Sequence, residues 1–325
     1  MKNLLLPLLL LGVVLAVPHS ASSAESDGLP QWRTPSSIKP DKFPEIDKQL
    51  AQKVDTCQVL HPTKHVFFFK LWHLAPSADT RTEIAQSMEA PQHDNQLAIF
   101  IQLDRWVRNK KAIQMYAEGC AWPQDITMSS SDKFNGWTVA DLSKKADDLN
   151  FADIMTNIGY KISARWKNQA RVRCGDDSDA MKSNLRAFSD ARGILGYLTR
   201  LEQNRKNPEG AKIYLEGVVE LYHLSKDTTV DQAIFRLNLE LKKSVDAIEH
   251  WIDVRNQRLV DAIMEDDSKF SAVVFGGAHA AGVRKLLEKR GVGCSIVEPW
   301  GYRDDELEML DNLRHLVNDR LKPTT

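Results

Sequence analysis

The chain has 325 residues, of which 42% are hydrophobic and 27% are charged, a composition typical of one large or two small globular domains. Its 43 Lys and Arg residues nearly balance its 44 Asp and Glu residues, which argues against a nucleic-acid-binding surface and against an acidic tail. The expected partner is therefore a small molecule or a peptide substrate. The composition indicates no particular oligomeric state.

The N-terminus has the order of regions found in a secretory signal peptide. Lys2 precedes an apolar stretch, Leu4–Val17, which is followed by small residues that end at Ala24. We therefore expect residues 1–24 to be removed on export to the periplasm or the medium. No later segment is long and apolar enough to span a bilayer, so no stable membrane span is expected after cleavage.

A proline-rich lead-in and one α/β domain are expected in the mature chain. Residues 25–44 contain four prolines among polar residues and read as an extended segment, whereas residues 45–325 are expected to form the folded domain. A short helix is predicted from residue 45 to about Asp55. The aromatic and β-branched run His65–Leu71 then predicts a buried strand that leads to His73.

Two further strand-like runs also end in acidic residues. The helical pattern of Asn95–Val107 precedes the run Ala112–Ala117, which leads to Glu118. The run Ala170–Cys174 leads to Asp176. Strands that alternate with helices predict a mostly parallel sheet flanked by helices, the α/β class.

A helical insertion is expected at about residues 141–265. Its pattern is mostly helical, with one or two long amphipathic helices between Val230 and Met264. The turn Lys206–Gly210 separates two helical stretches. We expect this region to form a cap over the sheet.

The last part of the chain predicts a strand–helix–strand unit. The apolar runs Ser271–Phe275 and Cys294–Val297 flank the helical stretch Ala280–Arg290. Gly276-Gly277-Ala278-His279 joins the first strand to the helix. His279 would therefore lie at a helix N-terminus, where the dipole disfavours imidazolium and keeps the ring available as a base or a metal ligand.

The carboxyl ends of these strands are where a ligand site is expected, because parallel strands bring those ends to one edge. The candidate residues at the strand ends are His73, Glu118, Asp176, His279 and Glu298. Two histidines with carboxylates could hold a divalent metal such as Zn or Mn, or could divide the roles of acid and base.

Each candidate also has a purely structural interpretation. His279 could only cap a helix, Asp176 could cap the helix that follows it, and Glu298 could be a turn residue before a proline. Glu118 needs a partner if it is buried, and Arg255 could supply one in a structural ion pair. These alternatives stay open from the sequence.

Four cysteines in an exported chain indicate disulfides, although they allow three pairings. Cys120 and Cys174 follow strand-like runs, whereas Cys57 and Cys294 precede them, so the two pairs are expected at opposite sheet edges. We predict the disulfides Cys120–Cys174 and Cys57–Cys294. Four buried free thiols are the alternative.

Several short motifs resemble one superfamily. His73 closes an early strand, Glu118 lies in YAEGC, Arg255-Asn256 lies in DVRNQRLVDAI, and Gly276–His279 forms a late Gly-x-x-His motif. This pattern resembles the erythromycin-esterase-like, haem-binding ChaN-like and TraB/Tiki-like proteins. The early motif departs from it, because it has Lys70 and Leu71 where the family commonly has glycine and often an acidic or hydroxyl residue.

The resemblance implies hydrolysis of an ester or peptide bond, either metal-assisted or histidine-based. His279 or His73 would bind metal or activate water, Glu118 would be a ligand or general base, and Arg255 would hold the carboxylate or stabilise negative charge. The implied metal ligands are His73, Glu118 and His279, and the implied ligand-binding residues are Asn256, Glu298 and Asp176. The superfamily also contains a haem binder, so a non-catalytic haem or small-ligand binding protein of the cell envelope is the alternative.

Overall fold

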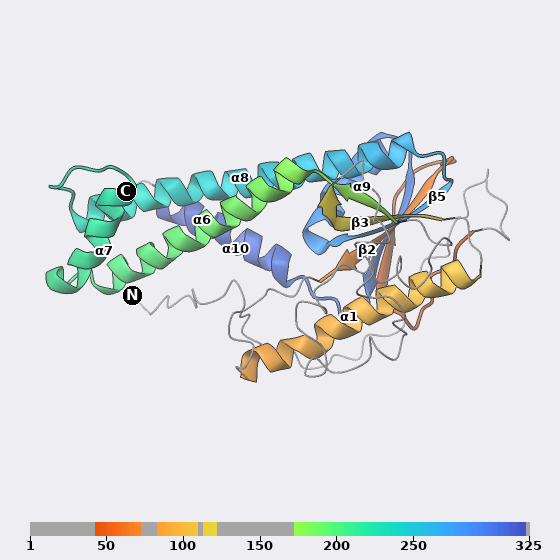
Figure 1. Cartoon of the computed structure of the whole chain (residues 1–325), viewed down its shortest axis with the longest axis horizontal. Helices are drawn as coiled ribbons and strands as arrows, with labels where there is room; N and C mark the ends of the chain where they lie inside the picture. The colour runs from red at the N-terminus through yellow and green to blue at the C-terminus, as the bar shows by residue number, and fades with distance from the viewer. Residues whose placement is uncertain (1–42, 73–82, 110–112, 122–171, 323–325) are drawn as a thin grey trace. The chain divides into compact units, whose positions relative to one another are not determined.

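The computed structural model describes residues 43–72, 83–109, 113–121 and 172–322. The predicted signal peptide, most of the lead-in, His73 and residues 141–171 of the predicted insertion lie outside this part of the chain. The elements in chain order are β1 (Ala51–Thr56), β2 (His65–Leu71), α1 (Glu83–Arg108), β3 (Gln114–Ala121), β4 (Val172–Asp176), α6 (Ser178–Gln203), α7 (Pro208–Leu221), α8 (Val230–Glu265), β5 (Phe270–Gly276), the 3-10 turn η4 (Gly277–His279), α9 (Ala280–Lys289), β6 (Gly293–Pro299) and α10 (Asp305–Arg320) (Figure 1).

The strands form one mixed, mostly parallel sheet in the order β1-β6-β2-β5-β3-β4. All neighbours are parallel except β1, which pairs antiparallel with β6 at the edge. The predicted α/β class is confirmed. The helix predicted from residue 45 to Asp55 is wrong, because residues 51–56 form β1. The backbone of this polar segment pairs with β6, which is far away in the sequence. The hydrophobic pattern of the segment itself does not indicate such a pairing.

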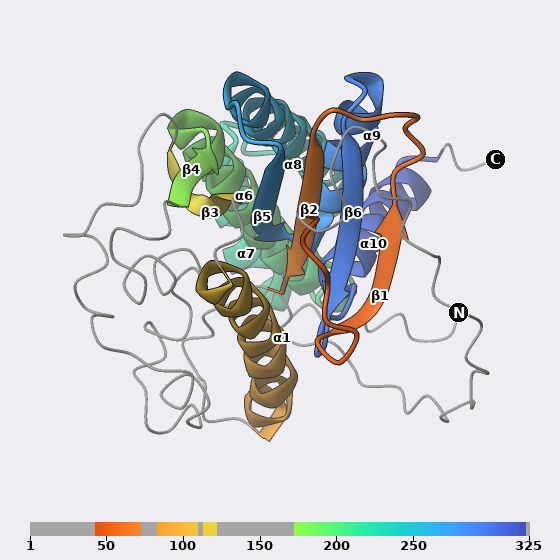
Figure 2. The same cartoon turned by 90° about the vertical axis from the view of Figure 1, so that its right-hand side faces the viewer.

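Helices cover both faces of the sheet, and each face has its own apolar core (Figure 2). On one face α1 packs through Ile99, Phe100, Leu103 and Trp106 against the strands. On the other face the C-terminal part of α8 and helix α9 pack through Leu259, Ile263, Val283 and Leu287. Because side chains alternate along a strand, Phe67 and Phe69 join the first core and Val66 and Phe68 join the second.

The connections change direction between β2 and β5. From β2 the chain continues through α1 on one face, whereas from β5 it continues through α9 on the other face to β6. Ligands in open α/β sheets bind at the carboxyl ends of strands beside such a switch point. The topology therefore directs attention to the edge where β2, β5 and β3 end.

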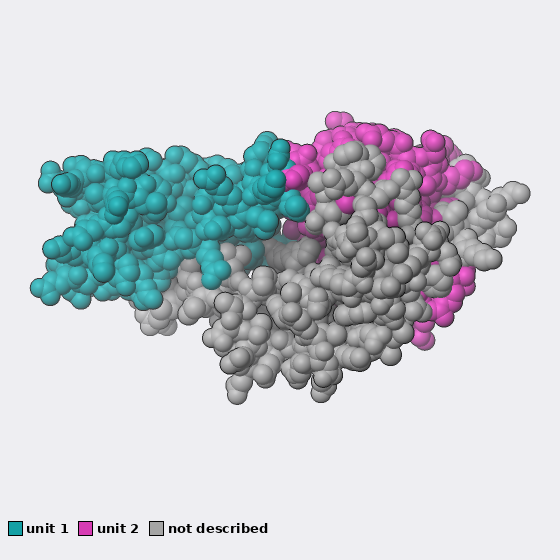
Figure 3. Space-filling model, in the orientation of Figure 1, with its two compact units in different colours: residues 1–13, 179–252, 305–325 teal, residues 14–178, 253–304 magenta. Residues whose placement is uncertain are grey.

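The chain divides into two compact units (Figure 3). The described residues of one unit are 179–252 and 305–322, which are helical. The other unit contains the sheet, α1, α9 and the end of α8. That the helical residues cap the sheet stays a prediction.

A disulfide joins Cys57 to Cys294 with 4.9 Å between their Cα atoms, which confirms that predicted pair. It fixes the end of β1 to β6. Cys174 is disulfide-bonded as well, and the side chain of Cys120 lies outside the described residues. Within the described ranges, every helix is too short or too polar to cross a lipid bilayer.

Candidate functional site

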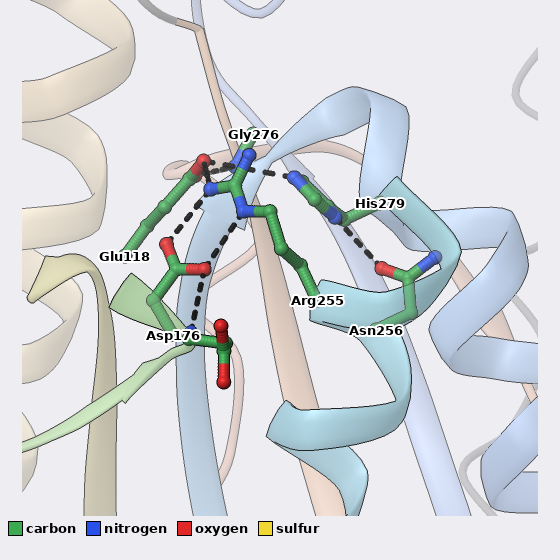
Figure 4. A network of polar contacts seen from close by, with 7 residues as sticks. Glu118, Asp176, Arg255, Asn256, Gly276 and His279 are labelled. Atoms are coloured by element: carbon green, nitrogen blue, oxygen red, sulfur yellow. Dashed lines mark hydrogen bonds and ion pairs between the residues drawn. The ribbon is translucent and has the colours of Figure 1, made fainter. Parts of the chain in front are cut away.

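Five of the predicted site residues meet at the carboxyl ends of β3, β4 and β5 (Figure 4). Glu118 and Asp176 come from β3 and β4, and His279 from the turn that follows β5. Arg255 and Asn256 reach the same place from α8. The glycine-rich turn after β5 places His279 directly before α9, as the sequence pattern predicts.

Arg255 binds both carboxylates of the site. Its Nε and Nη2 atoms donate to the two oxygens of Asp176 at 2.7 and 2.8 Å, and Nη2 also donates to Oε1 of Glu118 at 2.5 Å. Asp176 is fully buried and Arg255 is 6% exposed. Burial opposes the guanidinium charge, but Glu118 and Asp176 outweigh it and hold the pKa of Arg255 above its ordinary value.

The carboxylate of Glu118 is held at both oxygens. Oε2 accepts a hydrogen bond of 2.6 Å from the backbone N–H of Gly276, while Oε1 accepts from Arg255. The end of β5 and helix α8 thus fix the carboxylate plane. Asp176 also accepts from the backbone N–H of Asp177 at 3.1 Å, so it lies at the start of α6 and binds Arg255 as well.

His279 lies between Asn256 and Glu118. Its Nδ1 atom is 2.7 Å from Oδ1 of Asn256, and its Nε2 atom is 3.6 Å from Oε1 of Glu118. The ring of Phe275 packs edge-on against the imidazole, with 5.5 Å between the centroids. His279 is only 3% exposed, so its ring has little freedom to turn.

Two glycines allow these side chains to approach the backbone closely. A Cβ atom at Gly282 on α9 would overlap the amide nitrogen of Asn256, and a Cβ atom at Gly277 would overlap the hydroxyl of Tyr302. Larger residues at either position would displace these side chains. Gly282 was not among the candidates from sequence, where it reads only as an ordinary helix residue.

Glu298 belongs to a second polar cluster at the same edge of the sheet. Lys70 Nζ lies 2.8 Å from Glu298 and 3.3 Å from Asp304, and 5.0 Å from the centre of the Tyr302 ring. Glu298 therefore forms an ion pair with Lys70 and does not take part in the described contacts around His279. Lys70, the residue that departs from the resembled motif, is buried and forms ion pairs with both carboxylates.

The end of β2 is held by a residue that the sequence did not single out. Asn95 of α1 accepts from the backbone N–H of Trp72 at 2.9 Å and donates to the carbonyl of Lys70 at 3.1 Å. Asn95 is fully buried. A polar residue within an apolar helical pattern was the available signal. The next residue of the motif, His73, lies outside the described part of the chain.

The predicted metal ligands are His73, Glu118 and His279. The 3.6 Å between Nε2 of His279 and Oε1 of Glu118 is near the ~3.3 Å that separates two ligand atoms of a tetrahedral zinc ion. However, Arg255 already donates to the same oxygen and would repel a divalent cation. Within the described residues, no three His, Cys, Asp or Glu side chains are grouped to hold a metal. The predicted ligand set is incomplete in the described part of the chain, because His73 lies outside it.

Comparison with family models, with curated proteins and with solved structures found no match to this chain.

Proposed function

We propose that this protein is an exported hydrolase that cleaves an ester or peptide bond with His279 as general base. One observation carries the proposal. Nε2 of His279 and Oε1 of Glu118 face each other across 3.6 Å, which is too long for a hydrogen bond between them.

This distance suits a water molecule that donates to both atoms. Hydrogen bonds of about 2.8 Å from one oxygen to each atom are compatible with their separation. The water oxygen would then direct its lone pairs away from the two acceptors and towards a substrate carbonyl. As it attacks the carbonyl carbon, its proton would pass to Nε2 of His279, and His279 would return it to the leaving group.

The negative charge of the transition state needs a stabilising group. The η4 turn begins at Gly277 and leads into α9 at Ala280, and the first N–H groups of a helix have no partner within the helix. These groups and the helix dipole would stabilise an oxyanion formed beside His279. Arg255 holds the charge of Glu118 in place and keeps its carboxylate turned to His279.

The charge of the site favours a neutral substrate. One guanidinium faces the two carboxylates of Glu118 and Asp176, so the described residues of the network carry a formal charge of −1 when His279 is neutral. A phosphate ester would be repelled by this charge, whereas a carboxylic ester or an amide would not. An ester or peptide is therefore the proposed substrate class.

Export is part of the proposal. The Cys57–Cys294 disulfide is of a kind that forms in oxidising compartments such as the periplasm or the medium. It agrees with the signal-peptide pattern of residues 1–24. Recovery of full-length protein with an intact Met1 in the cytoplasm would contradict this part.

The activity test uses mature protein, starting at Glu25, with p-nitrophenyl acetate, p-nitrophenyl butyrate and a casein-derived peptide mixture as probes. We expect turnover that falls by about 10²- to 10⁴-fold in His279→Gln, because the general base is lost. Glu209→Gln, on the exposed start of α7, is the matched control and should keep full activity. Full activity in a folded His279→Gln would contradict the mechanism, and no turnover of any probe by the wild type would contradict the substrate class.

The same samples test the predicted cofactors. Near-stoichiometric Zn or Mn in protein purified without chelator, and its loss in His279→Ala and Glu118→Ala, would support a metal-assisted reaction in which His73 completes the ligand set. A Soret band on haem titration that is lost in His279→Ala would instead support the haem-binding alternative.

A further inference from the structure

We infer that Asn256, packed against Gly282, is a positioning residue that keeps the ring proton of His279 on Nδ1 and so leaves Nε2 as the basic nitrogen. The role in hydrolysis rests on the proposed function. The position of the proton does not, and it is measured separately below.

The first step is the direction of one hydrogen bond. Oδ1 of Asn256 lies 2.7 Å from Nδ1 of His279, and a carbonyl oxygen can only accept. Nδ1 must therefore carry a hydrogen. In a neutral imidazole the other nitrogen then has a lone pair, and Nε2 is the atom that faces Glu118.

The second step is how closely the Asn256 amide is packed, and what its orientation decides. Its Nδ2 side lies against Gly282, so closely that a Cβ atom there would overlap it. The side chain is 1% exposed, so the amide is confined where it meets the imidazole. A reversed amide would present a donor to Nδ1, which would move the ring proton to Nε2 and remove the base.

The third step is why an amide is suited to this place. Arg255 and Asn256 are adjacent on α8, and they hold Glu118 and His279 respectively. The network already has two carboxylates for one guanidinium. An aspartate at position 256 would also accept from Nδ1, but it would add a third negative charge, whereas the amide orients the ring without one.

The test reads the ring nitrogens directly. Protein labelled with 15N-histidine is studied by NMR at pH 8, and the signals of His279 are assigned by their loss in His279→Gln. We expect a protonated Nδ1 and an unprotonated Nε2 in the wild type. Asn256→Ala should give a mixture of both tautomers, and Asn256→Asp, which keeps an acceptor, should retain the wild-type pattern.

Activity gives a second reading. Because Asn256 acts through His279 and touches no substrate, Asn256→Ala should lower kcat by at least about tenfold with little change in KM, and Asn256→Asp should restore part of it. A wild type that carries the proton on Nε2 would overturn the inference. An Asn256→Ala protein with the wild-type tautomer would overturn it too. If no probe is hydrolysed, the proposed function fails while the tautomer still decides the inference.

Discussion

His65 lies at the amino end of β2 and His279 just after the carboxyl end of β5. The two show how the surroundings of a buried histidine decide its chemical properties. They are 5% and 3% exposed, so burial alone does not distinguish them. His65 packs between Phe43 and Phe67, with 5.1 and 4.8 Å between ring centroids, and its Nε2 meets only the hydroxyl of Ser295, at 2.8 Å. His279 instead lies among an amide, two carboxylates and a guanidinium.

The apolar setting has a defined consequence for His65. Burial lowers its pKa to about 4, because no neighbouring charge offsets the loss of hydration of the imidazolium. Its Nδ1 atom is buried and has no hydrogen-bond partner among the described residues. His65 is thus kept neutral as a packing residue. The comparison teaches that polar partners, more than depth, separate a candidate catalytic histidine from a structural one.

The largest expected effect on stability comes from removing a charged side chain of the polar site around His279. Arg255→Met would remove the guanidinium that binds the buried carboxylates of Glu118 and Asp176, and we expect the free energy of unfolding to fall by about 3–5 kcal/mol. Urea unfolding followed by circular dichroism measures it. Arg192→Met, at an exposed position of α6, is the matched control and should change stability by less than about 0.5 kcal/mol.

A second variant tests the cause. If the loss of the guanidinium beside two buried carboxylates is responsible, adding Glu118→Gln to Arg255→Met should recover part of the lost stability, since one of the two negative charges is removed. A double variant less stable than Arg255→Met alone would contradict this explanation.

The next largest effect is the pH dependence of stability that the buried His65 causes. The pKa of His65 is about 4 in the folded protein and about 6.5 in the unfolded chain. Below pH 6.5 the unfolded state therefore binds a proton that the folded state excludes. Neutral His65 therefore contributes to the free energy of unfolding in full above pH 6.5. That contribution is lost as the pH falls to 4, by about 3 kcal/mol in all.

Unfolding free energies measured between pH 4 and pH 7.5 in the wild type and in His65→Gln isolate that contribution. Glutamine can still bond Ser295 but does not titrate, so the variant should lose less stability across this range. His315→Gln, exposed on α10, should behave like the wild type. Equal pH dependence in the wild type and His65→Gln would contradict the assignment.

A smaller effect sharpens the account of His279. Gly282→Ala would push a methyl group into Asn256, and we expect it to cost about 1–3 kcal/mol despite the better helix propensity of alanine. Gly193→Ala in α6 meets no atom within 4 Å and should stabilise the protein by about 0.5–1 kcal/mol. Thermal unfolding of the pair is the measurement. Stabilisation by both substitutions would show that Asn256 is not confined.

The strands of this fold were predictable where they are buried on both faces. β2 and β5 are mostly apolar and rich in β-branched or aromatic residues, and β6 contains the β-branched pair Ile296-Val297. β1 was missed, since its segment is polar and becomes a strand only through its pairing with β6.

The site residues that follow apolar strand-like runs could be predicted from the sequence. Glu118, Asp176 and His279 each follow an apolar run, and parallel pairing brings such positions together. The partners could not be derived in the same way. Only the packing of α8 across the sheet decides that Asn256 meets His279, and only the pairing of β6 with β2 decides that Glu298 meets Lys70.

The smallest effect separates hydrogen bonding from burial at His65. Ser295→Ala removes the described hydrogen-bond partner of Nε2, and we expect a loss of about 1 kcal/mol in the free energy of unfolding, the usual contribution of one neutral hydrogen bond. Burial lowers the pKa of His65, and the rings of Phe43 and Phe67 provide part of that burial. Ser295→Ala should therefore lower stability equally at pH 4 and pH 7.5, which parallel unfolding curves would show. A loss confined to one end of that range would mean that the serine, and not the apolar packing of Phe43 and Phe67, keeps the imidazole neutral.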